Sequence, residues 1–377
     1  MRVLILLDAF SLGGAEKQAL LFANWLQNTK QEIVEVWAFM PGDGSAKAVC
    51  DRYGIKTRVI GYFRGLARYL YPLQIRKYSK LFNEFKPDVL MGYTNQPNLL
   101  LGLVWKHTTA KTFIWGQQGI EAAGYAFSKK ADRIAISNTP YFISNSINGA
   151  NFLKQELKIP EEKVLVVYNG PEPVQPLLSR QEWRHKLGLK DTDFVALMVA
   201  HIALRKDHDT AIDAWKIVVE RLLPENIVPV LLFAGIFGDA TQRLFQKVID
   251  NNLYPYIKFL GNVQDIAGLN LASDIHLLSS HTEGLPNSLL EAMYHSLPVV
   301  GTDIPGIREA LGDENNDFLV KPKDPADLAE KVIRLAKDME LRRQIGAKNK
   351  LRIEKHFKLD EMCRIHYEIM QKEVLAK

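Results

Sequence analysis

Residues 275–301 read IHLLSSHTEGLPNSLLEAMYHSLPVVG, and this stretch decides the fold class. A short apolar run, Ile275 to Leu278, leads into a polar loop, and the segment that starts at Pro286 has helical spacing. A second apolar run follows at Pro298 to Gly301. Short apolar runs without polar alternation are typical of strands that are buried on both faces of a parallel sheet. The stretch therefore predicts a strand, a helix and a second, parallel strand.

The same alternation of apolar runs and helical segments extends over the rest of the chain, and it predicts two doubly wound α/β sheets with helices on both faces. In the second half, further strands are expected at Phe194 to Ala200, Val230 to Ala234, Ile257 to Leu260 and Phe318 to Val320. In the first half, they are expected at Val3 to Leu7, Ile33 to Phe39, Asp88 to Met91, Thr112 to Trp115, Tyr141 to Ile143 and Val164 to Val167.

A break in this pattern separates the two halves. Residues 168–173 read YNGPEP, in which glycine and prolines interrupt regular structure. A chain of 377 residues also exceeds the size that one hydrophobic core usually serves. We predict an N-terminal Rossmann-like domain at 1–168, a C-terminal Rossmann-like domain at 169–355, and a final helix at 356–377 that packs back on the N-terminal domain. The residues from Asp324 onward are rich in Lys, Glu, Leu and Arg with helical spacing.

Charge is distributed unevenly between the halves. Residues 1–170 carry 21 Lys and Arg against 13 Asp and Glu, a net charge of +8, whereas the remainder carries 27 against 30, or −3. A positive half favours anionic partners such as phospholipid or a phosphorylated acceptor. No nucleic-acid-binding motif accompanies the charge, so we predict no nucleic-acid partner.

Composition predicts a cytoplasmic protein. No apolar stretch approaches the roughly 18 to 20 residues of a spanning helix. The N-terminal run Val3 to Leu7 ends at Asp8, which is too short for a signal peptide and favours a buried strand. Cys50 and Cys363 lie far apart without metal-like spacing, which fits a reducing compartment.

Three loops that follow predicted strands carry candidate site residues, because ligands of open parallel sheets bind beyond the carboxyl ends of the strands. After the first strand, Gly13 and Gly14 allow backbone amides to approach a phosphate at a helix start, although a plain strand-to-helix turn explains them equally well. After the strand Phe194 to Ala200, Arg205 and Lys206 are suited to clamp a diphosphate, or are simply solvated charges.

The third loop carries the strongest signal. Glu283 lies in the loop after Ile275 to Leu278, and Glu291 lies about one turn into the following helix. Free amides at Asn287, Ser288 and Leu289 would face an anion at the positive end of that helix. The two carboxylates would accept hydrogen bonds from ribose and sugar hydroxyls. The alternative is that Glu283 caps the helix and Glu291 is on a solvated face.

Together these motifs resemble the retaining glycosyltransferases of family 4, which have the two-domain GT-B fold. The resemblance covers nearly the whole sequence. It rests on LGGAEK at 12–17, VYNG at 167–170, VAHIALRK at 199–206, LLFAG at 231–235, FLGN at 259–262, EGLPNSLLEAM at 283–293 and LPVVGTD at 297–303.

The resemblance implies a role for each motif residue. Arg205 and Lys206 would bind the donor diphosphate and act in catalysis with Glu283, which would hold the transferring sugar. Donor binding is further implied for Gly13, Gly14, Asn262, Val263, Gly284, Asn287, Ser288, Leu289 and Glu291. The family generally needs no divalent metal, so we expect no cofactor and no metal site. The donor would be a nucleotide-diphosphate sugar, with UDP-sugar favoured, and the sugar would be transferred with retention.

The sequence departs from the family at the position of a histidine that many relatives carry beside the sugar. Here the strand Thr112 to Trp115 is followed by GQQGIE, and Gln117 or Gln118 is the candidate replacement on the acceptor or sugar side. A solvated loop is the alternative. His295 and Ser296, and the segment Ile304 to Gly306, also differ from the usual small residues, which leaves the donor sugar open.

The acceptors of the family are often glycans or lipid-linked sugars, which indicates a role in bacterial surface polysaccharide synthesis, such as lipopolysaccharide or capsule. The segment Tyr62 to Lys80 mixes basic and aromatic residues, a combination that suits an anionic membrane surface. We expect peripheral docking on the inner face of the cell membrane through the N-terminal domain. A basic surface over buried aromatics is the alternative.

Two other functions fit the same architecture. A cofactor-independent nucleotide-sugar epimerase would convert a nucleotide sugar into an isomer without acceptor, whereas a transferase would give at most slow hydrolysis. A non-catalytic sugar-binding protein would prefer free sugar to nucleotide, and the basic pair beside the glutamate motif argues against it.

Overall fold

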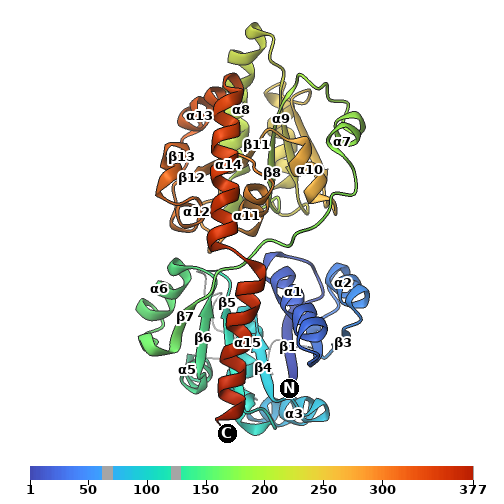
Figure 1. Cartoon of the computed structure of the whole chain (residues 1–377), viewed down its shortest axis with the longest axis vertical. Coiled ribbons are helices and arrows are strands. Elements are labelled where there is room, and N and C mark those ends of the chain that lie inside the picture. The colour runs from blue at the N-terminus through green and yellow to red at the C-terminus, as the bar shows by residue number, and fades with distance from the viewer. Residues whose placement is uncertain (62–70, 120–128, 377) are drawn as a thin grey trace. The chain divides into compact units, whose positions relative to one another are not determined.

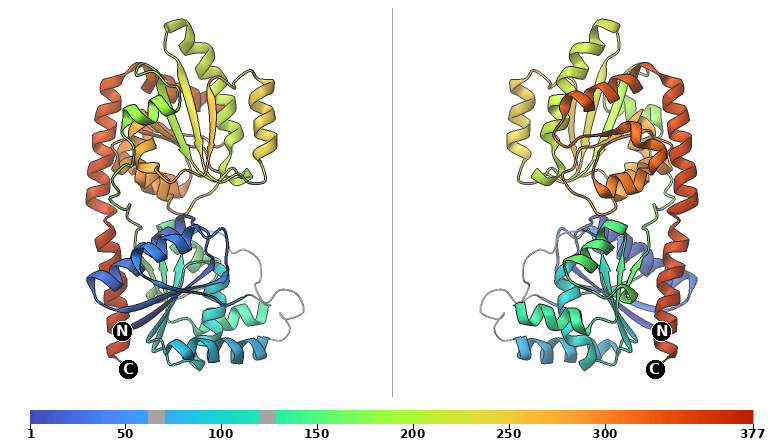
Figure 2. Two further views of the ribbon diagram at one scale, coloured as in Figure 1. Left: turned by 90° about the vertical axis from the view of Figure 1, so that its right-hand side faces the viewer. Right: turned by 90° about the vertical axis from the view of Figure 1, so that its left-hand side faces the viewer.

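The computed structural model describes residues 1–61, 71–119 and 129–376, and within it the chain forms two compact units. Unit 1 comprises Met1–Gly170 together with Leu359–Lys377, and unit 2 comprises Pro171–Lys358. Each unit is built on its own parallel sheet with helices on both faces, as the side views in Figure 2 show. The doubly wound α/β class predicted from the sequence is therefore confirmed.

Unit 1 has a seven-stranded sheet in the order β3-β2-β1-β4-β5-β6-β7, and every neighbouring pair is parallel. Its inner strand β1 is an apolar run whose alternate residues enter two different cores, Val3 and Ile5 on one face and Leu4 and Leu6 on the other. The strands are β1 (Arg2–Ala9), β2 (Ile33–Met40), β3 (Lys56–Val59), β4 (Val89–Gly92), β5 (Thr112–Gln117), β6 (Tyr141–Ser144) and β7 (Val164–Val166).

The helices of unit 1 cover both faces of this sheet. One core holds side chains from α1, α2 and α15, and the other holds side chains from α3, α4 and α5. The last helix of the chain, α15, lies beside α1 (Figure 1). The helices are α1 (Gly14–Thr29), α2 (Ser45–Tyr53), α3 (Tyr71–Phe85), α4 (Asn95–Val104), α5 (Lys129–Asn138), α6 (Ile147–Gln155) and α15 (Leu359–Leu375).

Unit 2 has a six-stranded parallel sheet in the order β10-β9-β8-β11-β12-β13. The strands are β8 (Phe194–Val199), β9 (Pro229–Ala234), β10 (Ile257–Gly261), β11 (Ile275–Leu278), β12 (Val299–Thr302) and β13 (Leu319–Val320). The helices are α7 (Arg180–Lys186), α8 (His208–Leu222), α9 (Thr241–Asp250), α10 (Ile266–Ala272), α11 (Asn287–Tyr294), α12 (Pro305–Leu311), α13 (Pro325–Lys337) and α14 (Met339–His356).

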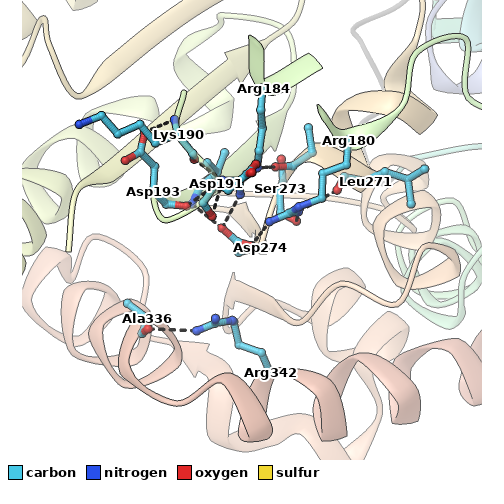
Figure 3. A network of polar contacts seen from close by, with 12 residues as sticks. Arg180, Arg184, Lys190, Asp191, Asp193, Leu271, Ser273, Asp274, Ala336 and Arg342 are labelled. Atoms are coloured by element: carbon cyan, nitrogen blue, oxygen red, sulfur yellow. Dashed lines mark hydrogen bonds and ion pairs between the residues drawn. The ribbon is translucent and has the colours of Figure 1, made fainter. Parts of the chain in front are cut away.

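A polar network fixes the amino-terminal ends of β8 and β11, the two strands at the centre of this sheet (Figure 3). Asp274, just before β11, accepts a hydrogen bond of 2.8 Å from the Val195 amide of β8. The same carboxylate pairs with Arg180 at 2.8 Å and with the buried Arg184 at 2.9 Å, both on α7. A buried arginine requires such partners, because an unpaired charge is costly to remove from water. The network therefore holds one end of the strand pair while leaving the carboxyl ends to carry loops.

Strand β3 was not predicted from the sequence. It is a four-residue edge strand whose side chains are mostly exposed, so it lacks the apolar pattern that reveals buried strands. Over the described ranges, no helix combines the length and the apolar character needed to cross a bilayer. Cys50 and Cys363 are both buried free thiols.

Candidate functional site

The candidate site of unit 2 lies where the strand order of its sheet reverses. Strands β8 and β11 are neighbours, but the chain continues from β8 toward β9 on one side and from β11 toward β12 on the other. The loops that leave their carboxyl ends consequently diverge, and such a switch point is the usual place for a ligand in an open parallel sheet. The two loops cover residues 200–207 and 279–286.

Lys206 and Glu283, 77 residues apart, meet at this switch point. The Lys206 ammonium forms an ion pair with Glu283 Oε1, and the side chains are only 14% and 8% exposed. Ser280 Oγ donates a second hydrogen bond of 2.6 Å to the same oxygen. Two partners on one oxygen fix the orientation of the carboxylate, and its second oxygen then has a defined direction.

Arg205 has a different environment from Lys206. Its side chain is exposed, and within the described part of the chain its guanidinium makes no ion pair or hydrogen bond. The two cations predicted to act as one clamp are therefore distinct, since Lys206 already neutralises a carboxylate and Arg205 does not.

Backbone hydrogen bonds join the two loops and set the position of the basic pair. The His281 amide donates to the Arg205 carbonyl at 2.9 Å, and Ser279 Oγ donates to the Asp207 carbonyl at 2.8 Å. Asp207 has a left-handed conformation (φ 49°) and caps α8, since its side chain accepts from the Thr210 amide at 3.4 Å and also from Thr210 Oγ1 at 2.7 Å. Sequence reasoning missed these supporting residues, although an Asp three residues before a Thr at a helix start is a recognisable capping signal.

Helix α11 carries the second half of the glutamate motif. It begins at Asn287 and places Glu291 about one turn further along. The Leu289 amide donates to the Pro286 carbonyl at 3.1 Å, so the prediction of a free amide at Leu289 is wrong. A helix that starts after proline readily forms this tight first turn.

Gly284 and Ser288 complete this loop and helix start. A Cβ added at Gly306, in the first turn of α12, would lie 1.9 Å from the Gly284 carbonyl oxygen. The motif segment is thus packed against the backbone of α12 and has little freedom to move. Ser288 lies on the first turn of α11 and is half-buried.

The loop after β10 contains Asn262 and Val263, at the same carboxyl edge of the sheet. Asn262 is exposed, whereas Val263 packs against the core cluster around Trp183. Burial lowers the pKa of His295, at the end of α11, while the negative charges of Glu291 and Asp265 act in the opposite direction.

Gly13 and Gly14 lie in unit 1, at the turn between β1 and α1. The Gly13 amide donates to Glu16 Oε2 at 3.1 Å, so this amide has a partner within the helix start, and the role of Gly13 and Gly14 in donor binding stays a prediction. Burial raises the pKa of the Glu16 carboxyl, and the nearby Asp8 carboxylate raises it further. The pair of glycines thus begins a helix whose own acidic residue satisfies the first amide.

The two glutamines after β5 differ in their environments. Gln117 uses both ends of its amide internally, since Trp115 Nε1 donates to its oxygen at 3.0 Å and its nitrogen donates to the Gly119 carbonyl at 2.6 Å. Gln118 Oε1 accepts hydrogen bonds from Asn145 at 3.2 Å and from Asn169 at 3.0 Å. These contacts orient the Gln118 NH2 group away from both asparagines, which makes Gln118 the better candidate of the two to contact a ligand.

The basic and aromatic segment Tyr62 to Lys80 is described only in part, because residues 62–70 lie outside the described ranges. Arg76 and Lys80 are exposed on α3 and line an open cavity of about 540 Å³. Tyr78 is buried, packs against Phe82 and donates to the Gly61 carbonyl at 2.7 Å, so the prediction that it belongs to an interfacial surface is wrong. No cluster of three metal-ligating side chains is found in residues 1–61, 71–119 and 129–376.

Two doubly wound parallel sheets in one chain, the second with a cation-paired carboxylate at its switch point, define the class of two-domain α/β proteins whose ligands bind at the carboxyl ends of parallel strands. Comparisons with known proteins narrow this class. The profile "Glycosyl transferases group 1" matches residues 179–352, and "Glycosyltransferase Family 4" matches residues 12–173. The chain belongs to the family 4, group 1 glycosyltransferases, as the sequence motifs predicted.

Individual relatives agree with this assignment. The chain is 30% identical over 209 residues to the putative glycosyltransferase EpsD of Bacillus subtilis, covering 54% of this chain and 53% of that protein. It is 28% identical over 188 residues to the Escherichia coli UDP-Gal:alpha-D-GlcNAc-diphosphoundecaprenol alpha-1,3-galactosyltransferase, covering 49% and 48%. The chain thus spans about half the length of these curated relatives.

The fold also matches solved structures. The Anabaena protein HepE, solved in complex with UDP-glucose, superposes with a TM-score of 0.82 at 20% identity, covering 99% of this chain and 100% of that one. The similarity confirms the predicted GT-B fold.

Proposed function

We propose that this protein transfers a sugar from a UDP-sugar to a glycan or lipid-linked acceptor, with retention at the anomeric carbon. The observation that carries the proposal is the Glu283 carboxylate at the switch point of unit 2, oriented by Ser280 and Lys206 and next to the exposed Arg205. Carboxylate oxygens bind sugar hydroxyls well, and adjacent cations bind a diphosphate. The E. coli relative, whose name specifies UDP-Gal as donor, supports the choice of nucleotide.

The proposed roles follow from the contacts of each residue. Arg205 offers its exposed guanidinium to the diphosphate, while Lys206 shares its charge between the diphosphate and Glu283. The oriented Glu283 carboxylate accepts hydrogen bonds from the transferring sugar. Glu291 accepts from the ribose, and the start of α11 presents Asn287 and Ser288 to the donor. Gln118 is proposed to donate its NH2 hydrogens on the acceptor or sugar side.

In the reaction, the bond between the anomeric carbon and the diphosphate oxygen breaks, and the acceptor hydroxyl attacks from the face that the diphosphate leaves. The proton of the hydroxyl passes to the departing phosphate. This route asks the protein for positioning and charge stabilisation rather than for a separate base. We propose that Arg205 and Lys206 supply this charge without a divalent metal, and full activity in the presence of EDTA would support it.

The first experiment is thermal stabilisation by UDP, GDP, ADP and their sugar conjugates, repeated on Arg205→Ala and Glu291→Ala. We expect UDP or a UDP-sugar to raise the unfolding temperature of the wild-type protein and to raise it much less in both variants. Arg343→Ala and Glu340→Ala are matched controls, because these exposed residues on α14 pair only weakly, at 3.9 Å. A wild-type protein that no nucleotide stabilises would contradict the proposal.

We further propose a peripheral location at an anionic membrane, in bacterial surface polysaccharide synthesis. The net charge of +8 over residues 1–170, from 21 basic and 13 acidic side chains, and the exposed Arg76 and Lys80 support this location. Sedimentation with anionic vesicles at low salt tests it, since an Arg76→Ala/Lys80→Ala variant should bind more weakly. A wild-type protein that remains in the supernatant would contradict it.

A further inference from the structure

Phe237 is a large apolar side chain at the functional edge of unit 2, and it is 49% exposed. It lies three residues beyond the carboxyl end of β9, in the loop before α9. A single exposed apolar residue is ordinary on a protein surface, so its neighbours decide whether it has a role.

The loops that carry candidate donor contacts surround this ring. The Ile202 amide donates to the Ile236 carbonyl at 3.0 Å, and Ile202 forms a parallel bridge with Phe237. On the other side, a Cβ added at Gly261 would lie 3.7 Å from the Phe237 ring, and Gly261 has the positive φ of 67° that favours glycine. Phe237 is therefore placed between the loop that leads to Arg205 and the loop that begins at Asn262.

Other aromatic rings support Phe237 from within unit 2. Phe237 packs edge-on against Phe245 of α9 at 5.9 Å between centroids, and Phe245 packs against Phe259 of β10 at 4.2 Å. Such aromatic pairs restrict the ring orientations. The exposed part of Phe237 is thus a supported, flat apolar surface rather than a loose side chain.

The position of Phe237, relative to the other candidate donor contacts, suits the base of a nucleotide. Arg205 and the start of α11 are suited to the diphosphate, and Glu291 to the ribose, which leaves the flat, uncharged base to be bound. Phe237 borders Gly261, so it lies next to the loop that carries the candidate donor contact Asn262. Bases stack well on aromatic side chains because both present π-faces.

We propose that Phe237 is the stacking surface for the uracil base of the donor. The assignment rests on the proposed function, because it takes the ligand to be a UDP-sugar. Stacking gives Phe237 a role in affinity for the base rather than in the choice among bases, since every natural base has a flat π-face and only a ring that is not flat would lose the contact. This makes Phe237 a binding residue that the sequence motifs did not identify.

The test compares UDP with 5,6-dihydrouridine 5′-diphosphate, whose base is not planar, by titration calorimetry. The wild-type protein should bind UDP between roughly 5-fold and 150-fold more tightly than the dihydro analogue. Phe237→Ala should bind both ligands with similar, weaker affinity, and Phe237→Tyr should retain the preference. Tyr254→Ala is the matched control, because Tyr254 is a 69% exposed aromatic residue before the opposite end of β10, and it should behave like the wild type.

Two results would overturn the assignment, and they are distinguishable. If the wild-type protein binds UDP and Phe237→Ala keeps its preference over the dihydro analogue, the stacking role is wrong while the proposed function stands. If the wild-type protein does not bind UDP, the proposed donor is wrong and the assignment to Phe237 is wrong with it. If the role of Phe237 were purely structural, Phe237→Ala would bind both ligands more weakly by the same factor and would keep the wild-type preference for UDP.

Discussion

Glu283 is buried enough that its charge must be paired within unit 2. Its side chain is 8% exposed, and Lys206 supplies the positive charge while Ser280 supplies a hydrogen bond. Removing a partner from such a pair is far more costly than the net value of the pair, because it leaves a carboxylate without compensation. Lys206 is therefore a positioning residue for Glu283 as well as a candidate contact for the diphosphate, whereas Arg205 has only the second of these roles.

His276 provides a test of burial within strand β11. It lies in β11, is fully buried, and neither of its ring nitrogens has a hydrogen-bond partner among the described residues. Burial lowers its pKa to about 3 from an ordinary value of 6.5. The unfolded chain therefore takes up a proton between these two pH values while the folded chain does not, so stability is fully present above pH 6.5 and falls as the pH is lowered.

We predict that His276 alone costs unit 2 about 2 kcal/mol of unfolding free energy between pH 7 and pH 5, and that His276→Leu removes this loss. Hydrogen exchange of peptides from β8 and β11 at the two pH values, corrected for intrinsic rates, measures the effect. His356→Leu is the control, because His356 is exposed at the end of α14 and its replacement should leave the pH dependence unchanged. Equal pH dependence in the wild type and His276→Leu would contradict the prediction.

At the scale of elements, the apolar strands could be predicted and the polar one could not. Every expected apolar run forms a strand, and most of these strands are buried on both faces of a parallel sheet, which leaves a continuous apolar signature. The edge strand β7 is also apolar, with the sequence VLV, although Leu165 and Val166 are exposed. Strand β3 has the sequence KTRV and is mostly exposed at the sheet edge, so its pairing with β2 depends on the fold around it. The helices after Asp324 were expected from their spacing, and they are α13, α14 and α15.

The candidate site could be located from sequence, but its internal contacts could not. The motif loops follow apolar strands, so their place at the carboxyl edge is predictable. The pairing of Lys206 with Glu283 depends on β8 and β11 being neighbours, which separation in sequence does not reveal. The Gly13 amide is a different case, because Glu16 at the third helical position is a known capping signal that could have been recognised.

The packing of α12 against the motif loop leads to a prediction about Gly306. A Cβ there would lie 1.9 Å from the Gly284 carbonyl oxygen and 2.7 Å from the Glu283 carbonyl oxygen, so Gly306→Ala must displace the loop. We expect at least a 10-fold loss of transferase kcat/KM, because small displacements of catalytic groups are costly. Activity is measured with the donor identified by the nucleotide panel, together with the unfolding temperature.

Gly346→Ala is a matched control for Gly306→Ala. A Cβ at Gly346, on α14, would lie 2.0 Å from the Ser296 carbonyl oxygen, which is a similar clash beyond the end of α11. Both variants should lose stability, but the loss of kcat/KM at matched stability should be greater for Gly306→Ala. Equal activity losses in the two variants would indicate a general effect of overpacking rather than displacement of Glu283.

At the scale of the whole molecule, the last helix of the chain completes the hydrophobic core on one face of the sheet of unit 1. Helix α15 contributes Met362, Cys363 and Met370 to the core cluster that also contains α1 and β1. Polar contacts reinforce this packing, since Trp25 donates to Asp360 at 2.8 Å and Tyr141 donates to Glu373 at 2.9 Å. Unit 1 is therefore discontinuous in sequence, and its core cannot form completely until the end of the chain is present.

This arrangement predicts that damage to α15 weakens unit 1 and spares unit 2. Met370 is fully buried, so Met370→Asp places an unpaired charge in the core of unit 1, at a cost of about 3 kcal/mol. For a unit of this size the unfolding temperature should fall by roughly 6 to 12 °C. Hydrogen exchange during a temperature ramp measures both units at once, with β1 peptides reporting unit 1 and β8 peptides reporting unit 2. Leu375→Asp, at a position that is 83% exposed, should change neither. If β1 and β8 lose protection together in Met370→Asp, the two units unfold as one, and α15 would stabilise the whole chain rather than the sheet on which it packs.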